Sequence, residues 1–230
     1  MDIFQKINSL FLLFFITFLL SPNLVNAKNA TDYRQEGLAY RSQGNLPAAI
    51  ASLSQAVNLA PGDSNNYVIL GWTQHLAGEN TTAAKTLWQA IWLKPQLVEA
   101  ANALGIVYLV RGELSSAILT HQWAGYLKAN NEIAYYNLSL AYQLEKEFAL
   151  AIAYAKLAIK LEPQNPHPLV SLAISHWADS NPTEAKLAFQ QAINLDARYR
   201  SSQFLDFLQE AGFSSGQIAQ AKEILTSFMN

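Results

Sequence analysis

The sequence predicts an all-helical solenoid, built from five helix–turn–helix hairpins and closed at its C-terminal end by further helices. Three observations predict it. A period of 34 residues runs through residues 30–199 without an insertion, each period holds two amphipathic stretches of helical spacing, and turn-forming residues recur between those stretches. Chance similarity does not keep one register over five consecutive units.

The period is visible at single positions. Gly37, Gly71 and Gly105 lie 34 residues apart, and two series of alanines keep the same step through all five units: Ala49, Ala83, Ala117, Ala151 and Ala185, then Ala56, Ala90, Ala124, Ala158 and Ala192. The predicted units are residues 30–63, 64–97, 98–131, 132–165 and 166–199.

Each unit is predicted to be one helical hairpin. In the second unit the small residues Gly71, Ala83 and Ala90 let the helix backbones approach, while Tyr67 and Leu87 fill the space between neighbouring hairpins. Gly44, Gly78 and Gly112 stand where the first helix must end, because glycine tolerates the left-handed conformation there. Pro61, Pro95 and Pro163 end the second helix, since proline lacks the amide hydrogen.

Residues 1–27 lie outside the repeats and read as a secretory signal peptide. Lys6 precedes an apolar stretch from Leu10 to Leu20, and small residues before Lys28 offer a cleavage site. The stretch is shorter than the roughly 20 residues that span a bilayer. The alternative is that the segment is retained as a membrane anchor. Either way the repeats, residues 28–199, would face the exported side of a membrane, in a secreted or periplasmic protein.

Residues 200–230 depart from the repeat and are predicted to form capping helices. Phe204, Phe207 and Leu208 make one apolar stripe, and residues 218–228 make a second, with Ser214 as the expected N-cap of the last helix. We expect this tail to cover the exposed end of the fifth hairpin.

Composition and motifs indicate no catalytic site, no metal site and no nucleic-acid-binding surface. The charged fraction is 14%, against about 25% in a usual soluble protein, the net charge is −2, and there is no basic stretch for nucleic acid. Cysteine is absent, and no nucleophile, phosphate-binding or metal-binding motif is present. His121 and His176 occupy packing positions of the repeat. We therefore predict no catalytic residue, no metal site and no cofactor.

The period and the pattern of Gly, Ala and Pro positions resemble the tetratricopeptide-repeat family. The resemblance covers about three quarters of the chain. It implies a right-handed superhelix whose first helices line a concave groove for a protein or peptide partner. Carried over to this chain, the ligand-facing positions are Arg34, Leu38, Arg41, Val68, Trp72, His75, Asn102, Ile106, Tyr136, Leu140 and Trp177. The same positions also include Leu109, Gln143, Val170 and Ile174.

This predicted groove is largely apolar, unlike the family's well-known clamp for a peptide carboxylate. Only Arg34, Arg41, Asn102 and Asn137 could serve such a clamp, so a hydrophobic strand or an amphipathic helix is the expected ligand. The alternative is that the apolar side chains pack against one another inside a tightly wound solenoid.

A second predicted contact surface lies on the convex side. Trp88, Trp92, Leu119 and Tyr126 occupy outward positions of second helices, where other units carry polar residues such as Ser54. Exposed aromatic clusters mark contact sites, and we favour a protein over a bilayer as the partner. The alternative is that the tail or a loop covers these rings.

The sequence thus predicts a non-catalytic scaffold or assembly factor of the cell envelope, which binds other proteins through the groove and the convex surface. A membrane-anchored assembly factor, with residues 1–27 retained, is the second interpretation.

Overall fold

The computed structural model describes residues 28–228, and the proposed signal segment, residues 1–27, lies outside this range. Ten α-helices form five consecutive hairpins, and among the described residues there is no β-strand. The hairpins are α2 (Ala30–Ser42) with α3 (Leu46–Leu59), α4 (Ser64–Leu76) with α5 (Asn80–Leu93), α6 (Val98–Val110) with α7 (Leu114–Leu127), α8 (Glu132–Leu144) with α9 (Phe148–Leu161), and α10 (Pro166–Ala178) with α11 (Pro182–Leu195). This confirms the predicted all-helical solenoid.

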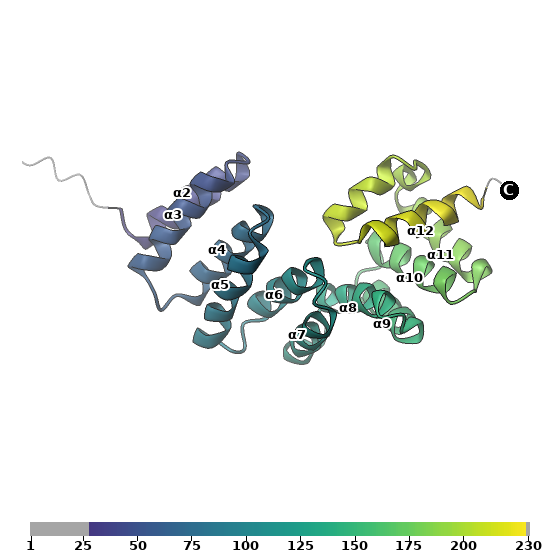
Figure 1. The fold of residues 1–230 in the computed structure, drawn as a ribbon, viewed down its shortest axis with the longest axis horizontal. Helices are drawn as coiled ribbons and strands as arrows, with labels where there is room; N and C mark the ends of the chain where they lie inside the picture. Colours follow the sequence, from purple (N-terminus) through teal and green to yellow (C-terminus); the bar gives the residue numbers. More distant parts are fainter. Residues whose placement is uncertain (1–27, 229–230) are drawn as a thin grey trace, which may run out of the picture.

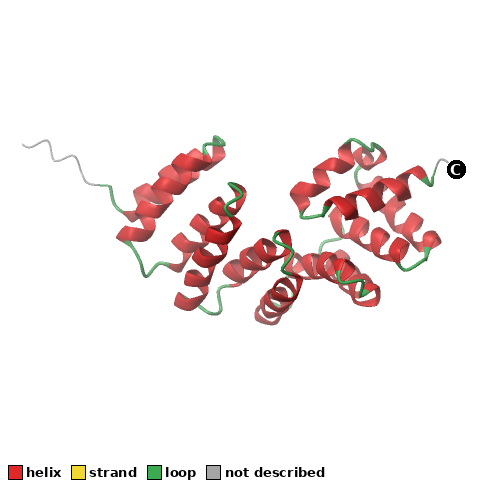
Figure 2. Ribbon diagram, viewed as in Figure 1, coloured by secondary structure: helices red, strands yellow, loops and turns green. Residues whose placement is uncertain are grey.

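The hairpins follow one another along an arc, and the C-terminal tail leans into its opening (Figure 1). The tail consists of the 3₁₀ helices η1 (Ala197–Arg200) and η2 (Phe204–Ala211) and the α-helix α12 (Ser215–Thr226). Loops between these elements are short throughout (Figure 2). None of the described helices is long and apolar enough to cross a bilayer.

Within each of the first three hairpins the two helices touch at a glycine of the first helix. A Cβ placed on Gly37 or Gly71 would lie 2.6 Å or 2.7 Å from the Cγ atom of Leu53 or Leu87, respectively. At the same contact in the third hairpin, a Cβ on Gly105 would lie 2.5 Å from Nε2 of His121. Glycine is thus required by the close approach of the second helix.

The first helices end in a left-handed residue at the same place in every hairpin. Gly44, Gly78 and Gly112 have φ values of 75°, 79° and 71°, as predicted, and the fourth and fifth hairpins place Lys146 and Ser180 there at 64° and 60°. A side chain in this region of φ and ψ is strained. The packing of the fold therefore sets this backbone geometry even where glycine is missing.

The tail reaches further than the sequence predicted. Ser214 caps α12 in a capping box with Gln217, which confirms the expected N-cap. Helix α12 packs on α10 and α11, at the end of the fifth hairpin, but the tail also contacts α8. The side chain of Gln217 donates to the carbonyl of Leu140, and the Tyr136 hydroxyl donates to the carbonyl of Ala211. The tail therefore covers part of the concave face as well as the end of the fifth hairpin.

Candidate partner-binding groove

The first helices of successive hairpins bring the predicted groove residues onto one face. Trp72 and His75 of α4, Ile106 of α6 and Tyr136 of α8 line a common pocket of about 300 Å³, together with residues 209–212 of the tail. Ile106 lies 34 residues after Trp72, and His75 lies three residues after Trp72. Tyr136 lies one helical turn before Leu140, the next position of the 34-residue series, so these side chains come side by side once the hairpins stack.

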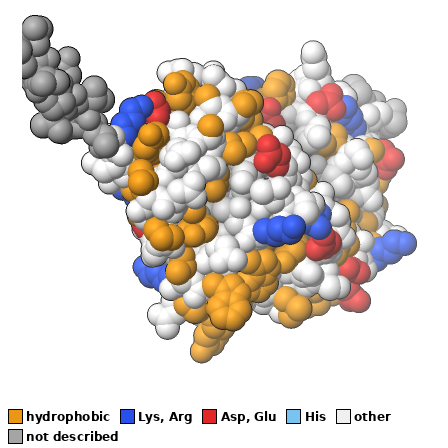
Figure 3. Space-filling view, turned by 60° about the vertical axis from the view of Figure 1, so that its left-hand side comes forward, with side chains coloured by type: hydrophobic (Ala, Val, Ile, Leu, Met, Phe, Trp, Pro, Cys, Tyr) orange, Lys and Arg blue, Asp and Glu red, His pale blue; other side chains and the backbone are white. Residues whose placement is uncertain are grey.

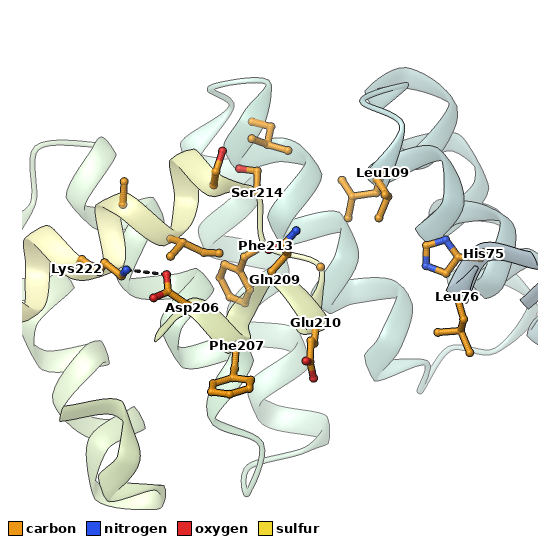
Figure 4. Close-up of a pocket in the computed structure, with 16 residues that line it drawn as sticks. His75, Leu76, Leu109, Asp206, Phe207, Gln209, Glu210, Phe213, Ser214 and Lys222 are labelled. Carbon is orange, nitrogen blue, oxygen red and sulfur yellow. Dashed lines mark hydrogen bonds and ion pairs between the residues drawn. The ribbon is translucent and has the colours of Figure 1, made fainter. Parts of the chain in front are cut away.

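The open part of the groove is a cleft between the first helices and the tail. It has a volume of about 1240 Å³, and it shares part of its lining with the 300 Å³ pocket. His75, Leu76 and Leu109 stand on one side, and Phe207, Glu210 and Phe213 of the tail stand on the other (Figure 4). Leu76 and Val110 are 48% and 50% exposed. Apolar side chains thus remain uncovered at the mouth of a concave site.

The rest of the groove is filled by the chain's own tail. Leu140, Val170 and Ile174 are completely buried there. Gln143 accepts from the Gln217 amide at 2.9 Å and donates to Gln220 at 2.8 Å. The Trp177 indole N–H points to a carboxylate oxygen of Glu223 at 3.3 Å. In this structure, the predicted groove positions of the fourth and fifth hairpins therefore serve mainly to hold the tail.

The polar residues that could have clamped a carboxylate are engaged by their neighbours. Arg34 forms an ion pair with Asp63 at 3.1 Å and also contacts the Asn66 side chain. Arg41 donates to the Thr73 hydroxyl at 3.4 Å, and Asn102 exchanges two hydrogen bonds with Asn131. Asn137 donates to a backbone carbonyl of its own helix. The remaining predicted positions, Leu38 and Val68, are half-buried.

The buried ring of His121 and the hydroxyl of the half-buried Tyr136 are held in their neutral forms. Burial lowers the pKa of His121 to about 3, and the adjacent backbone of Gly105 opposes this only in part. Neither ring nitrogen of His121 has a hydrogen-bond partner among the described residues. Burial also raises the pKa of Tyr136 well above 10, so its hydroxyl remains a donor to the tail. His121 and Tyr136 thus act through packing and hydrogen bonding.

The convex aromatic surface is exposed. The relative exposures are 44% for Trp88, 78% for Trp92, 67% for Leu119 and 79% for Tyr126, and the Trp88 indole N–H donates to the Tyr108 hydroxyl at 2.8 Å. Neither the tail nor a loop of the described chain buries these side chains. Figure 3 shows hydrophobic side chains gathered along the lower edge of one face, the edge toward which α5 and α7 lie in Figure 1.

The sequence reasoning missed one member of this surface. Trp123, on α7, is 42% exposed and stacks on Tyr126 with ring centroids 5.5 Å apart. The signal was available, because Trp123 and Tyr126 are three residues apart on one helix and so are neighbours on its surface. We define the convex aromatic surface as Trp88, Trp92, Leu119, Trp123 and Tyr126.

Within residues 28–228 no group of histidine and carboxylate side chains is placed to hold a metal ion. The unpartnered nitrogens of His121 are enclosed in a helix contact, where no ligand could reach them.

Comparison with known proteins agrees with this architecture. The sequence model of the tetratricopeptide repeat matches residues 35–63 and 133–165. No curated protein sequence matches the chain. The solved structures include MamA from Desulfovibrio magneticus RS-1, residues 41 to the end, with a TM-score of 0.67 and 19% identity over 75% of this chain and 97% of that one.

Two further solved structures have the same fold. A MamA crystal structure has a TM-score of 0.65 and 24% identity, covering 74% of this chain and 92% of that one. TTC0263, a tetratricopeptide-repeat protein of Thermus thermophilus, has a TM-score of 0.61 and 20% identity over the same shares, 74% and 92%. The unbroken register, the stacked hairpins and these matches together show the tetratricopeptide-repeat fold, and the family model itself matches two of the five units, the first and the fourth.

Proposed function

We propose that this protein is a non-catalytic scaffold or assembly factor of the cell envelope, and that it binds a partner protein in the open part of its concave groove. The observation that carries the proposal is the 1240 Å³ cleft between the first helices and the tail, with Leu76 and Val110 half-exposed at its mouth. A concave apolar groove is the form of site that holds the apolar face of a partner's amphipathic helix.

The tail supports this use of the groove. It shows that a helix with an apolar stripe fits against the first helices, because α12 buries Ile218, Ala221 and Ile224 on the concave side and end of the fourth and fifth hairpins. The neighbouring surface of α4 and α6 has the same apolar character and carries no such cover from the described chain. A helix or extended segment of a partner can take that place.

The binding site is tested with the partner recovered on the protein from its native envelope fraction. Trp72→Ala combined with Ile133→Ala removes apolar surface from the pocket and should reduce recovery of that partner at least tenfold, at unchanged helix content. Lys156→Ala with Lys160→Ala, two exposed residues of α9, is the matched control and should be neutral. Equal loss in both double variants would refute the groove as the binding site.

The envelope location rests on residues 1–27. A positive residue, an apolar stretch and a small-residue site are what signal peptidase requires. Intact mass of the native protein should correspond to a chain that begins at Lys28. A mass that includes Met1 to Ala27 would favour the second interpretation, a membrane-anchored assembly factor facing the exported side.

The convex aromatic surface is a second candidate contact site, favoured by the exposure of Trp92 and Tyr126. Exposed tryptophan and tyrosine side chains are common at the energetic centres of protein interfaces. Trp92→Ala with Tyr126→Ala should leave the melting temperature within a degree or so, because both rings are mostly in water, and should lower partner recovery. Unchanged recovery would remove this surface from the proposal.

A further inference from the structure

The open cleft is acidic as well as apolar. The lining of the cleft and of the 300 Å³ pocket that joins it includes four carboxylates, Glu132, Glu162, Asp206 and Glu210, and a single lysine, Lys222. Lys222 and Asp206 form an ion pair at 2.6 Å and so offset each other. The 300 Å³ pocket is lined by three glutamates and, among the described residues, by no lysine or arginine.

These glutamates come from three separate parts of the chain. Glu132 begins α8, Glu162 follows α9, and Glu210 lies in η2 of the tail. Glu162 accepts a hydrogen bond from Asn165 at 3.0 Å, and neither Glu132 nor Glu210 forms an ion pair with another described residue. Glu132 and Glu162 line the 300 Å³ pocket and Glu210 lines both the pocket and the cleft, so this joined space carries negative charge that no ion pair with a described residue balances.

Aromatic and aliphatic side chains line the same pocket as these carboxylates. Trp72, Ile106, Ile133 and Tyr136 line the same pocket as Glu132, Glu162 and Glu210. A lysine or arginine side chain matches such a lining, since its methylene groups pack on apolar surface and its charged end reaches a carboxylate or an aromatic face. A ligand with a free carboxylate would find no unpaired lysine or arginine in the described lining, because Lys222 is paired with Asp206 and both Arg34 and Arg41 are engaged elsewhere.

We propose that the occupant of the open cleft is an amphipathic helix of a partner protein, with lysine or arginine residues flanking its apolar face. The helical form follows from α12, which shows how a helix is held on the neighbouring part of the same face. The cationic flank follows from the three unbalanced glutamates. This inference rests on the proposed function, because it assigns a chemical class to the partner of the same groove.

Three synthetic helical peptides test it against the full chain. They share one leucine face and differ in the other face, which is lysine, glutamine or glutamate. Fluorescence anisotropy of the labelled peptides gives the dissociation constants. The lysine peptide should bind at least tenfold more tightly than the glutamine peptide, and the glutamate peptide should bind most weakly. The preference should vanish in about 1 M salt, where the Debye length falls to about 3 Å.

Variants place the effect in the cleft. Glu132→Gln with Glu210→Gln should weaken the lysine peptide about tenfold and leave the glutamine peptide unchanged. Glu147→Gln with Glu184→Gln removes two exposed carboxylates that begin second helices outside the cleft, and it should change neither constant. An equal effect of both double variants would mean that general attraction to an acidic protein, and not this cleft, selects the peptide.

The results separate this inference from the proposed function. If all three peptides bind equally and Trp72→Ala weakens all of them, the groove binds helices but the cationic partner is refuted. If no peptide binds, or if Trp72→Ala has no effect on any, both the inference and the proposed groove are refuted.

Discussion

The two halves of the concave face carry equivalent residues in different surroundings. Ile106 and Leu140 occupy the same position in the third and fourth repeats, yet Ile106 is half-buried at a pocket wall and Leu140 is completely buried. The difference comes from the tail, which lies over α8 and α10 and leaves α4 and α6 uncovered. The repeat register therefore determines which way a side chain faces, and the tail determines whether a partner can reach it.

The two halves should also differ in their stability against unfolding. In a solenoid each hairpin contacts mainly its neighbours, so stability is close to a sum of local terms. The fourth and fifth hairpins have an additional partner in the tail, whose side chains join their core: Tyr199, Leu205, Leu208, Phe213, Ile218, Ala221 and Ile224. We expect the C-terminal half to be the more stable part, and the following substitutions test that difference.

The largest effect is expected for Ile224→Ala. Ile224 is completely buried in α12, and such truncations cost about 2–5 kcal/mol. The loss should appear as faster hydrogen exchange in α8, α10 and α12, with α2 to α5 unaffected. Thr226→Ala, at an exposed position of the same helix, is the control. Faster exchange in α2 to α5 would show that the two halves do not behave separately.

Gly71→Leu should instead destabilise the N-terminal hairpins, which the tail does not cover. Its Cβ would lie 2.7 Å from Leu87 and 3.3 Å from the carbonyl oxygen of Ala83, and overpacking of this kind costs about 1–3 kcal/mol. Ala83→Leu, at the other side of the same contact, should act alike. Thermal unfolding should broaden or split as the second hairpin melts first. Gly62→Ala, with no atom within 4 Å, should melt like the unaltered chain. If Gly71→Leu and Ala83→Leu also melt like the unaltered chain, the contact between the two helices is assigned incorrectly.

His121→Leu should stabilise the boundary between the halves by about 1–3 kcal/mol, because it removes a buried polar side chain without hydrogen bonds. Leucine already fills this place in the first two hairpins, as Leu53 and Leu87. The measurement is chemical unfolding at neutral pH. A destabilised variant would mean that the imidazole makes a favourable contact.

His121 should also make the stability of the folded protein depend on pH. Burial lowers the pKa of His121 from 6.5 to about 3, so between these values the unfolded chain binds a proton that the folded protein does not. Stability contributed by the neutral ring should thus be lost as pH falls from about 6.5 toward 3. His121→Leu should flatten this part of the curve. Parallel curves for the two proteins would contradict the assignment.

The smallest effect is expected at the turns. Lys146→Gly and Ser180→Gly relieve side chains held at φ values of 64° and 60°, which should stabilise the C-terminal half by up to about 1 kcal/mol each. Gly44→Ala, at the equivalent turn of the first hairpin, should destabilise by a similar amount. Chemical unfolding measures all three. Equal signs for the three changes would show that the turn geometry is not the cause.

Much of the fold could be predicted from the sequence because period, helix contact and turn depend on local residues. Gly71 against Leu87 and the cap at Ser214 are of this kind. The path of the tail could not be predicted, since it depends on contacts such as Gln217 with Leu140, which are 77 residues apart and have no counterpart in the repeat. The register alone places Trp72 and Tyr136 on one face, whereas the contribution of Glu210 to the acidic lining depends on where η2 lies.

The direct test of the central claim is the accessibility of equivalent groove positions. The chain contains no cysteine, so Ile106→Cys and Leu140→Cys each introduce a single thiol at the same repeat position. Under native conditions the thiol at position 106 should react with a maleimide reagent within minutes. The thiol at position 140 should react at least a hundredfold more slowly, at the rate at which the tail opens. Equal rates at the two positions would contradict the account, because the tail would then not divide the groove.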